Sequence, residues 1–262
     1  MKPLKAQPSD LFRRTLCLPA VLLVAVLMSW GFTPHKRLHA VAWSYLPSDF
    51  RLAWNLDSQQ LIDRAIQADS RKHSDSLEAE RHYLDMDDLA LDGHDVVGLK
   101  WGVASKRLSL GTLGSERRYG VLPWELEASY WRLVRAFSPG DSAFPDPSRI
   151  ERAAADLGHY LADAHVPLHT SGNYDGQRTN QRGIHALWET HAVEWMLGQD
   201  QMKHCPPCDI HEMRYDPVWT PWEIVAESHA LAPDVFRAEK TWTALQGMKG
   251  YGFRRRGRTL HL

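Results

Sequence analysis

The sequence predicts a single all-α domain. Several segments place apolar residues three and four positions apart, as helices with one buried face do, and no segment shows a convincing two-residue alternation. There is also no internal repeat. The chain has 262 residues, of which 44% are hydrophobic and 10% aromatic, so it can bury one sizeable core, or at most two. Its net charge of −1 excludes a global electrostatic signature of nucleic-acid or anionic-membrane binding, so any steering of a charged substrate must be local.

Residues 1–29 are predicted to be a signal peptide. The apolar run from Leu16 to Met28 is too short for a comfortable membrane span but has the length of a signal-peptide core. Basic residues precede it, namely Lys2, Lys5, Arg13 and Arg14. Cleavage after Ser29 would leave residues 30–262 as an exported domain, secreted or periplasmic. A retained signal anchor stays open as an alternative, because Leu27 is bulkier than the residue usually found two positions before the last signal residue.

The first half of the chain is predicted to contain short helices. They run from His35 to Tyr45, from Asp49 onward, and from Gln59 to Ala68. Ser58 is expected to cap the third of these, whose buried face would comprise Leu61, Ile62, Ala65 and Ile66. Residues 89–122 are rich in glycine and mixed in polarity, and we expect a loop with short elements there.

The second half is predicted to contain longer helices. Pro123 stands at the first turn of one, with an apolar stripe comprising Trp124, Leu126, Tyr130, Leu133, Val134 and Phe137. After a Pro-rich linker, the capping box of Ser148 and Glu151 opens a helix that Pro167 ends. A further helix is expected to reach Leu197, and Thr220 and Glu223 form a second capping box. Pro233 is expected to interrupt that last helix, and the basic residues 254–258 to form a frayed tail.

The stretch from His159 to Glu189 has the ligand pattern of a metal site. His159 and Asp163 are four residues apart on one expected helix, as are His185 and Glu189 on another, so each pair points off one helix face. His169 follows Pro167 and is placed to turn back toward the same pocket. Imidazole and carboxylate ligands without thiolate suit zinc. A single histidine of this kind is usually an ordinary surface or core residue, but so many in one short stretch indicate a site.

Two cysteines remain after the signal peptide, Cys205 and Cys208 in C-P-P-C. In an exported protein they are expected to form a small disulfide loop. The other readings are a redox motif, which would need a strand-to-helix context, and a zinc knuckle, which would need a second pair. His204 and His211 flank the cysteines and keep the zinc reading open.

Four motifs together resemble the superfamily of zinc-dependent phospholipases C and single-strand-specific zinc nucleases. They are W-x4-H at Trp30 and His35, D-x12-H at Asp69 and His82, H-x3-D-x5-H at His159, Asp163 and His169, and H-x3-E at His185 and Glu189. The resemblance implies an all-helical domain with three zinc ions in a cleft at one end. It covers the chain from Trp30 to Glu189 with the motifs in the same order. Members of the superfamily usually continue into a final long helix beside the cleft, and this chain stops soon after residues 254–258.

The resemblance also implies which residues hold each ion. The first ion would take Asp69, His82, His159 and Asp163, and the second His169, His185 and Glu189. The third would take His35, the shared carboxylate of Asp163, and the amine nitrogen and carbonyl oxygen of Trp30. The free amine exists only after cleavage behind Ser29, so the signal peptide and the metal site support each other.

A carboxylate shared by two close zinc ions implies a water between them with a lowered pKa, and the natural reaction is hydrolysis of a phosphodiester. Asp163 is thus one expected catalytic residue. The resemblance implies Asp69 as a second, as a general base, because this position lies next to the bridging water in members of the superfamily. Arg71 and Lys72 are candidates to contact phosphate. Tyr83 and Asp85 stand where the nucleases stack and hydrogen-bond a base.

The sequence favours a phospholipid substrate, with single-stranded nucleic acid as the alternative. Glu189 at the end of the second-ion motif and the short loop from His169 to His185 match the phospholipases. The compact start from Trp30 to His35, together with Tyr83 and Asp85, matches the nucleases instead. A non-catalytic, zinc-stabilised exported protein is a third reading, disfavoured because structural zinc sites are closed four-ligand sets that are often rich in cysteine. Neither a protein partner nor an oligomeric state is indicated.

Overall fold

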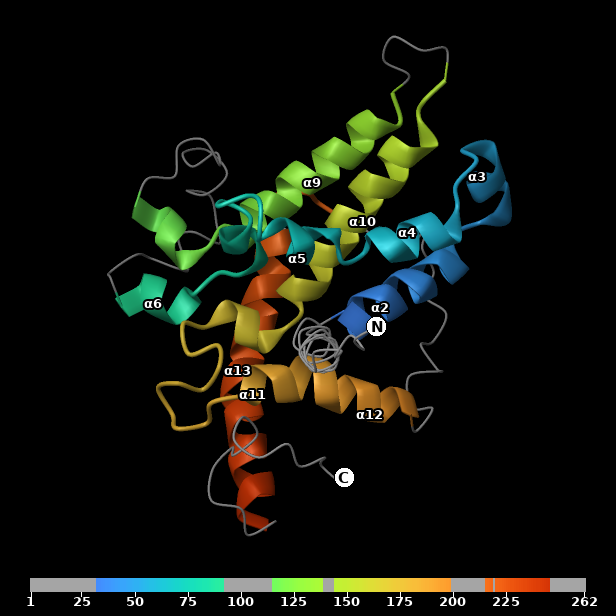
Figure 1. Ribbon diagram of the computed structural model, residues 1–262. Coiled ribbons are helices and arrows are strands. Elements are labelled where there is room, and N and C mark those ends of the chain that lie inside the picture. Colours follow the sequence, from blue (N-terminus) through green and yellow to red (C-terminus); the bar gives the residue numbers. More distant parts are fainter. Residues whose placement is uncertain (1–31, 92–114, 139–143, 199–214, 219, 246–262) are drawn as a thin grey trace, which may run out of the picture.

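The computed structural model describes residues 32–91, 115–138, 144–198, 215–218 and 220–245, and in these ranges the chain is helical without any strand (Figure 1). The prediction of an all-α fold is therefore confirmed. None of the helices in these ranges is both long and apolar enough to cross a membrane. The predicted signal peptide, Trp30, the Cys205–Cys208 pair and residues 254–258 lie outside the described residues.

Short helices form the first half of the described chain. They are α2 (Phe32–Tyr45), α3 (Ser48–Ala53), α4 (Ser58–Arg64), α5 (Gln67–Arg71), the 3-10 turn η1 (Ala79–His82) and α6 (Met86–Leu91). The single helix expected from Gln59 to Ala68 is wrong, since α4 and α5 are separate. The cap is also Asp57 rather than Ser58, because the Asp57 carboxylate accepts the backbone N–H groups of Gln59 and Gln60.

Two long helices form the middle of the fold, α9 (Leu122–Ala136) after the 3-10 turn η3 (Ser115–Tyr119), and α10 (Pro147–Ala164). The apolar stripe of α9 is buried only in its first half, because Trp124 and Leu126 are buried while Val134 is 42% exposed. The expected capping box of α10 is wrong. Asp146 caps the helix by accepting the N–H of Ser148, and the Glu151 carboxylate instead accepts the N–H of Asp57.

The last described part runs through η4 (Pro167–Thr170), α11 (Ile184–Ala186), a π-helical turn η5 (Leu187–Ala192), α12 (Val193–Gly198) and α13 (Thr220–Leu245). The interruption expected at Pro233 is wrong, since α13 is continuous through it. Ala232 and Val235 on either side of the proline are buried, and Val235 packs on Leu168 of η4. A proline inside a helix costs about 3 kcal/mol, and burial of the flanking apolar side chains offsets this.

Helix α10 lies at the centre of the arrangement. It packs against α9, α4, α2 and α13, and Figure 1 shows α9 and α10 side by side with α2 and α4 beside α10. The main core joins the inner faces of α9, α10 and α13, and includes Leu126, Tyr160 and Val225. Because α10 is held from several sides, side chains on its C-terminal half occupy fixed positions facing α2, α5 and η1.

Candidate metal centre

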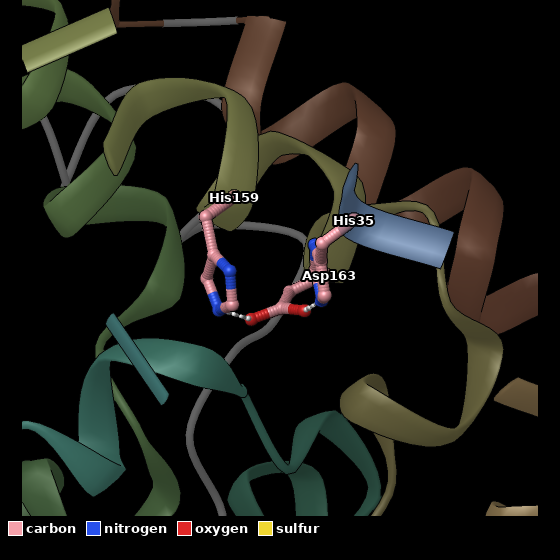
Figure 2. A group of neighbouring side chains, drawn as sticks. All are labelled: His35, His159 and Asp163. Atoms are coloured by element: carbon pink, nitrogen blue, oxygen red, sulfur yellow. Dashed lines mark ion pairs between the residues drawn. The ribbon is translucent and has the colours of Figure 1, made fainter. Parts of the chain in front are cut away.

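Asp163 of α10 is the hub of the candidate site. Its side chain is almost fully buried, and its two carboxylate oxygens face different histidines. Oδ1 lies 3.3 Å from His35 Nε2, while Oδ2 lies 2.8 Å from His82 Nδ1 and 3.4 Å from His159 Nε2. Figure 2 shows His159 and His35 on opposite sides of this carboxylate. One carboxylate is therefore placed to serve two neighbouring ligand groups.

The first ligand group comprises Asp69, His82 and His159, whose ligand atoms all lie within 4.8 Å of one another. Asp69 Oδ1 is 3.8 Å from both His82 Nδ1 and His159 Nε2, and those two nitrogens are 3.1 Å apart. Ligands bound at about 2 Å in a tetrahedral site stand roughly 3.3 Å from one another. The spacing in this group therefore fits one metal ion, with Asp163 completing the set.

The second group comprises His169, His185 and Glu189. The Glu189 carboxylate lies 2.7 Å from His169 Nε2 through Oε1 and 2.9 Å from His185 Nε2 through Oε2. The two imidazole rings are stacked with their centroids 5.1 Å apart. Glu189 stands in the π-helical turn η5, a rare conformation that often occurs at functional sites.

Backbone carbonyls orient most of these imidazoles. His159 Nδ1 lies 2.8 Å from the carbonyl oxygen of Ala65, and His169 Nδ1 lies 2.6 Å from that of His82. His185 Nδ1 lies 3.3 Å from the carbonyl oxygen of Tyr174. Each Nδ1–H is the donor in such a pair, so Nε2 keeps its lone pair and faces the ligand group, as metal-binding histidines require.

The centre contains buried carboxylates whose negative charge must be balanced by nearby positive charge. Although burial opposes its ionisation, the surrounding His159 and His169 hold the pKa of the Asp163 carboxyl well below its usual range. The same balance, with His169 and His185 as the partners, holds the pKa of Glu189 low. Burial works against the charged imidazole of His169, but Glu189 and Asp163 raise its pKa to about 9. Buried carboxylates that stay ionised need cations beside them, and metal ions would fill that role.

Part of a third group is also described. His35 stacks on His159 with ring centroids 3.9 Å apart, and together with Asp163 they form a set that could hold an ion. His35 Nδ1 is buried and has no hydrogen-bond partner among the described residues. His35, His159 and Asp163 could thus provide part of the coordination shell of a third ion. Trp30, the remaining expected ligand, lies outside the described residues, so its role stays a prediction.

The residues expected to contact substrate lie at different places. Lys72 is beside the centre, with Nζ 2.7 Å from Asp69 Oδ1. Arg71 points to the other side of α5, where it pairs with Glu78 and Asp156 at 3.2 and 3.0 Å. Its donors are thus engaged within the protein, and its contact with phosphate stays a prediction.

Tyr83 and Asp85 follow His82 directly along the chain. Both are partly exposed, and the Asp85 backbone N–H donates to the carbonyl of Tyr119. Burial, helped by the nearby charges of Asp87 and Asp88, raises the pKa of Asp85 to about 7. Burial and the Asp85 charge also raise the pKa of Tyr83. Their contact with a substrate base stays a prediction.

The raised pKa of Asp85 predicts a pH-dependent stability. The folded protein binds this proton more tightly than the unfolded chain, so the contribution of Asp85 to the free energy of unfolding should fall as pH rises from about 4 to about 7. Asp85→Asn should therefore stabilise the metal-free protein at pH 8, on the order of 1 kcal/mol or ~3 °C in Tm, and have little effect at pH 4. Thermal unfolding of both proteins across this range is the measurement.

Asp87→Asn is the matched control for this prediction. The Asp87 carboxylate accepts hydrogen bonds from Ser171 Oγ and the Gly172 N–H, both at 2.8 Å, so its neutralisation should weaken the fold at pH 8. If Asp85→Asn behaved like Asp87→Asn, Asp85 would be a stabilising carboxylate and its raised pKa would be wrong.

No family model, curated protein or solved structure matches this chain. The case for a metal centre therefore rests on the chain's own residues. Apart from Trp30, all the ligands expected from the sequence lie in the groups described above.

Sequence reasoning missed one residue behind the centre, Glu78. Its side chain is fully buried and lies 3.4 Å from His82 Nε2 through Oε1. The available signal was its position four residues before His82, the same spacing that pairs His159 with Asp163 and His185 with Glu189. It was overlooked because a glutamate in a charged stretch usually faces solvent.

Proposed function

We propose that this protein is an exported, zinc-dependent hydrolase that cleaves phosphodiester bonds with a metal-activated water. The observation that carries the proposal is the Asp163 carboxylate, which presents one oxygen to His35 and the other to His82 and His159. A shared carboxylate of this kind suits adjacent ions that act together on one substrate. Purely structural zinc sites are typically closed sets of four protein ligands around one ion, without a carboxylate shared between two ions.

Zinc bound in these groups would supply Lewis acidity and lower the pKa of a water molecule. The chain's own residues set the geometry and move the proton. Asp69 is the candidate base, and it would accept the proton at a carboxylate oxygen. Burial opposes the charge on Asp69, but His159 and Lys72 outweigh it and lower its pKa, so the carboxylate is ionised at neutral pH. Lys72, 2.7 Å from Asp69, is also the cation best placed to meet a substrate phosphate.

A phospholipid is the favoured substrate. An open hollow of about 450 Å³ lies along α2, on the face of the helix that points away from His35, and none of the metal ligands lines it. Its walls are mostly apolar, with Phe32, Ala40 and Ile66, and Lys36 and Arg37 add positive charge. Such a surface could bind the hydrocarbon part of a phospholipid only outside the metal centre, so it is secondary support for this choice. Glu189 as the last ligand of the second group agrees with this choice.

Single-stranded nucleic acid is the alternative, and specific aromatic residues favour it. Tyr174 is 53% exposed and lies edge-on to the His185 ring with a centroid distance of 6.1 Å. Tyr83 lies on the chain next to His82, with the partly exposed Asp85 two residues further on. Exposed aromatic rings beside a phosphate-cleaving centre can stack bases, and Asp85 could accept hydrogen bonds from a base edge.

The test compares substrates on one preparation of processed protein. We expect a phosphatidylcholine analogue to be hydrolysed on the glycerol side of its phosphate, single-stranded DNA to be a poor substrate, and a chelator to abolish both activities. Elemental analysis should give three zinc ions per chain. Preferred cleavage of DNA, lost in Tyr83→Leu, would select the nuclease. Tightly bound zinc without hydrolysis of either substrate would select the non-catalytic reading.

A further inference from the structure

We infer that Glu78 is a positioning residue that fixes the ring of His82 so that Nδ1, and not Nε2, faces the metal. The inference rests on the metal centre of the proposed function. Glu78 comes just before η1, with its side chain fully buried, and Oε1 lies 3.4 Å from His82 Nε2. On the other edge of the same ring, Nδ1 faces Asp163 Oδ2 and His159 Nε2. The two ring nitrogens therefore have different surroundings.

His82 is oriented in the opposite sense to the other imidazoles of the centre. His159, His169 and His185 each direct Nδ1 to a backbone carbonyl and Nε2 to the ligand group. His82 directs Nε2 away from the group, and no backbone carbonyl receives it. That buried nitrogen makes no hydrogen bond of adequate geometry to any described residue, and the Glu78 carboxylate, at 3.4 Å, is the acceptor beside it.

A carboxylate beside the outer ring nitrogen of a metal-binding histidine affects the histidine's tautomer and metal affinity more strongly than a backbone carbonyl does. It selects the tautomer with the proton on Nε2, and its charge makes Nδ1 a better donor to a metal. In metal sites such outer carboxylates typically change the affinity for the ion by 10–100-fold. We therefore assign Glu78 to the ion held by Asp69, His82 and His159.

Several donors hold Glu78 itself in place. Arg71 Nε and Arg81 Nη1 lie 3.2 and 2.5 Å from its Oε2, and the Tyr160 hydroxyl donates to Oε1. Although burial opposes the charge, the neighbouring His82 and the hydrogen bonds from Tyr160 and Arg71 hold the pKa of Glu78 well below its usual range. These donors hold the carboxylate in its position beside His82.

The first test observes the zinc-loaded protein without any change at Glu78. Long-range proton–nitrogen NMR distinguishes a protonated, a free and a metal-bound imidazole nitrogen, and a His82→Gln sample assigns the signals. We expect His82 to carry its proton on Nε2 and the metal on Nδ1, while His159, His169 and His185 show the reverse. Metal on His82 Nε2 would overturn the inference.

The second test compares Glu78→Gln with Glu125→Gln in zinc titrations of chelated protein against a competing chromophoric chelator. Glu125 is a buried carboxylate that pairs with the same Arg81, at 3.6 Å, but does not contact His82. Both variants remove one buried charge, so both should lower the Tm of the metal-free protein. Only Glu78→Gln should weaken one zinc site, by ~10–100-fold.

Equal zinc affinity in wild type and Glu78→Gln, or equal weakening in both variants, would overturn the role of Glu78 and leave the proposed function intact. Wild-type protein that binds no zinc would overturn the proposed function itself, and this inference with it. Glu78→Asp adds a variant that keeps the charge in a shorter side chain. We expect it to retain more affinity than Glu78→Gln.

Discussion

Asp163→Asn should reduce phosphodiesterase activity by ~10³-fold or more and remove two of the three expected zinc ions. The carboxylate faces His35 with one oxygen and His82 and His159 with the other, so both neighbouring groups lose a ligand at once. A bound metal stabilises the transition state by several kcal/mol, and each 1.4 kcal/mol is a factor of ten in rate. Asparagine keeps the size of the side chain but has only one oxygen. Its NH2 group has no lone pair to offer, so it cannot ligate a second cation.

Asp156→Asn is the matched control, because Asp156 lies on the same helix, two turns earlier, and pairs with Arg71 at 3.0 Å. Its neutralisation should leave the zinc content at the wild-type value and change the rate little. Zinc content by elemental analysis and initial rates on both substrates are the measurements. An Asp163→Asn protein that kept three ions, or most of its activity, would show that this carboxylate is not shared between ions.

The ligand groups could be predicted because their geometry is local. His159 and Asp163, like His185 and Glu189, are four residues apart on a helix, and this spacing alone puts both side chains on one face. His169 followed from Pro167, which opens a new turn directly after α10. Asp69 and His82 carry no such local signal. Their place at the centre depended on the resemblance to known zinc enzymes.

The break between α4 and α5 could not be predicted, because the apolar pattern of Leu61, Ala65 and Ala68 continues through it. The break coincides with a contact to a residue that lies far away in the sequence. The Ala65 carbonyl accepts a hydrogen bond from His159 Nδ1 at 2.8 Å, a contact between residues 94 positions apart. A continuous helix would use this carbonyl within the helix, so the orientation of a metal ligand outweighs helix propensity here.

Glu78 and the helix around Pro233 are two further features that could not be predicted from local sequence. Glu78 could not be recognised from the sequence, because nothing local indicates that Arg71, Arg81 and Tyr160 converge on it. The continuity of α13 through Pro233 depends on contacts with η4, which lies more than 60 residues earlier in the chain. In each case tertiary contacts determine a local feature that propensity alone would assign differently.

Removal of the metal should lower the Tm by ~15–30 °C. Ions that bind only the folded chain each add about 4 kcal/mol when their free concentration is a thousand times Kd. The two groups built wholly from described side chains would thus contribute ~8 kcal/mol, and each kcal/mol corresponds to about 2–4 °C in a domain of this size. Thermal unfolding with and without excess chelator, with zero bound metal verified, is the measurement. An unchanged Tm would contradict the presence of metal in these groups.

The chelated protein should also show a narrower pH range of stability than the loaded one. The lowered pKa values of Asp163 and Glu189 give stability that is present above the unfolded carboxyl pKa, near 4, and is lost as pH falls below it. The pKa of His169, raised to about 9, gives stability that is complete below its unfolded value near 6.5 and is lost as pH rises through about 9.

Without ions, Tm should therefore be highest between about pH 5 and pH 7. Asp163→Asn is the control for the predicted fall in Tm on metal removal. Because this variant should already lack two ions, chelation should lower its Tm less than that of the wild type. A fall in Tm as large as that of the wild type would mean that the stabilising ions bind without Asp163, and that the centre is organised around another ligand.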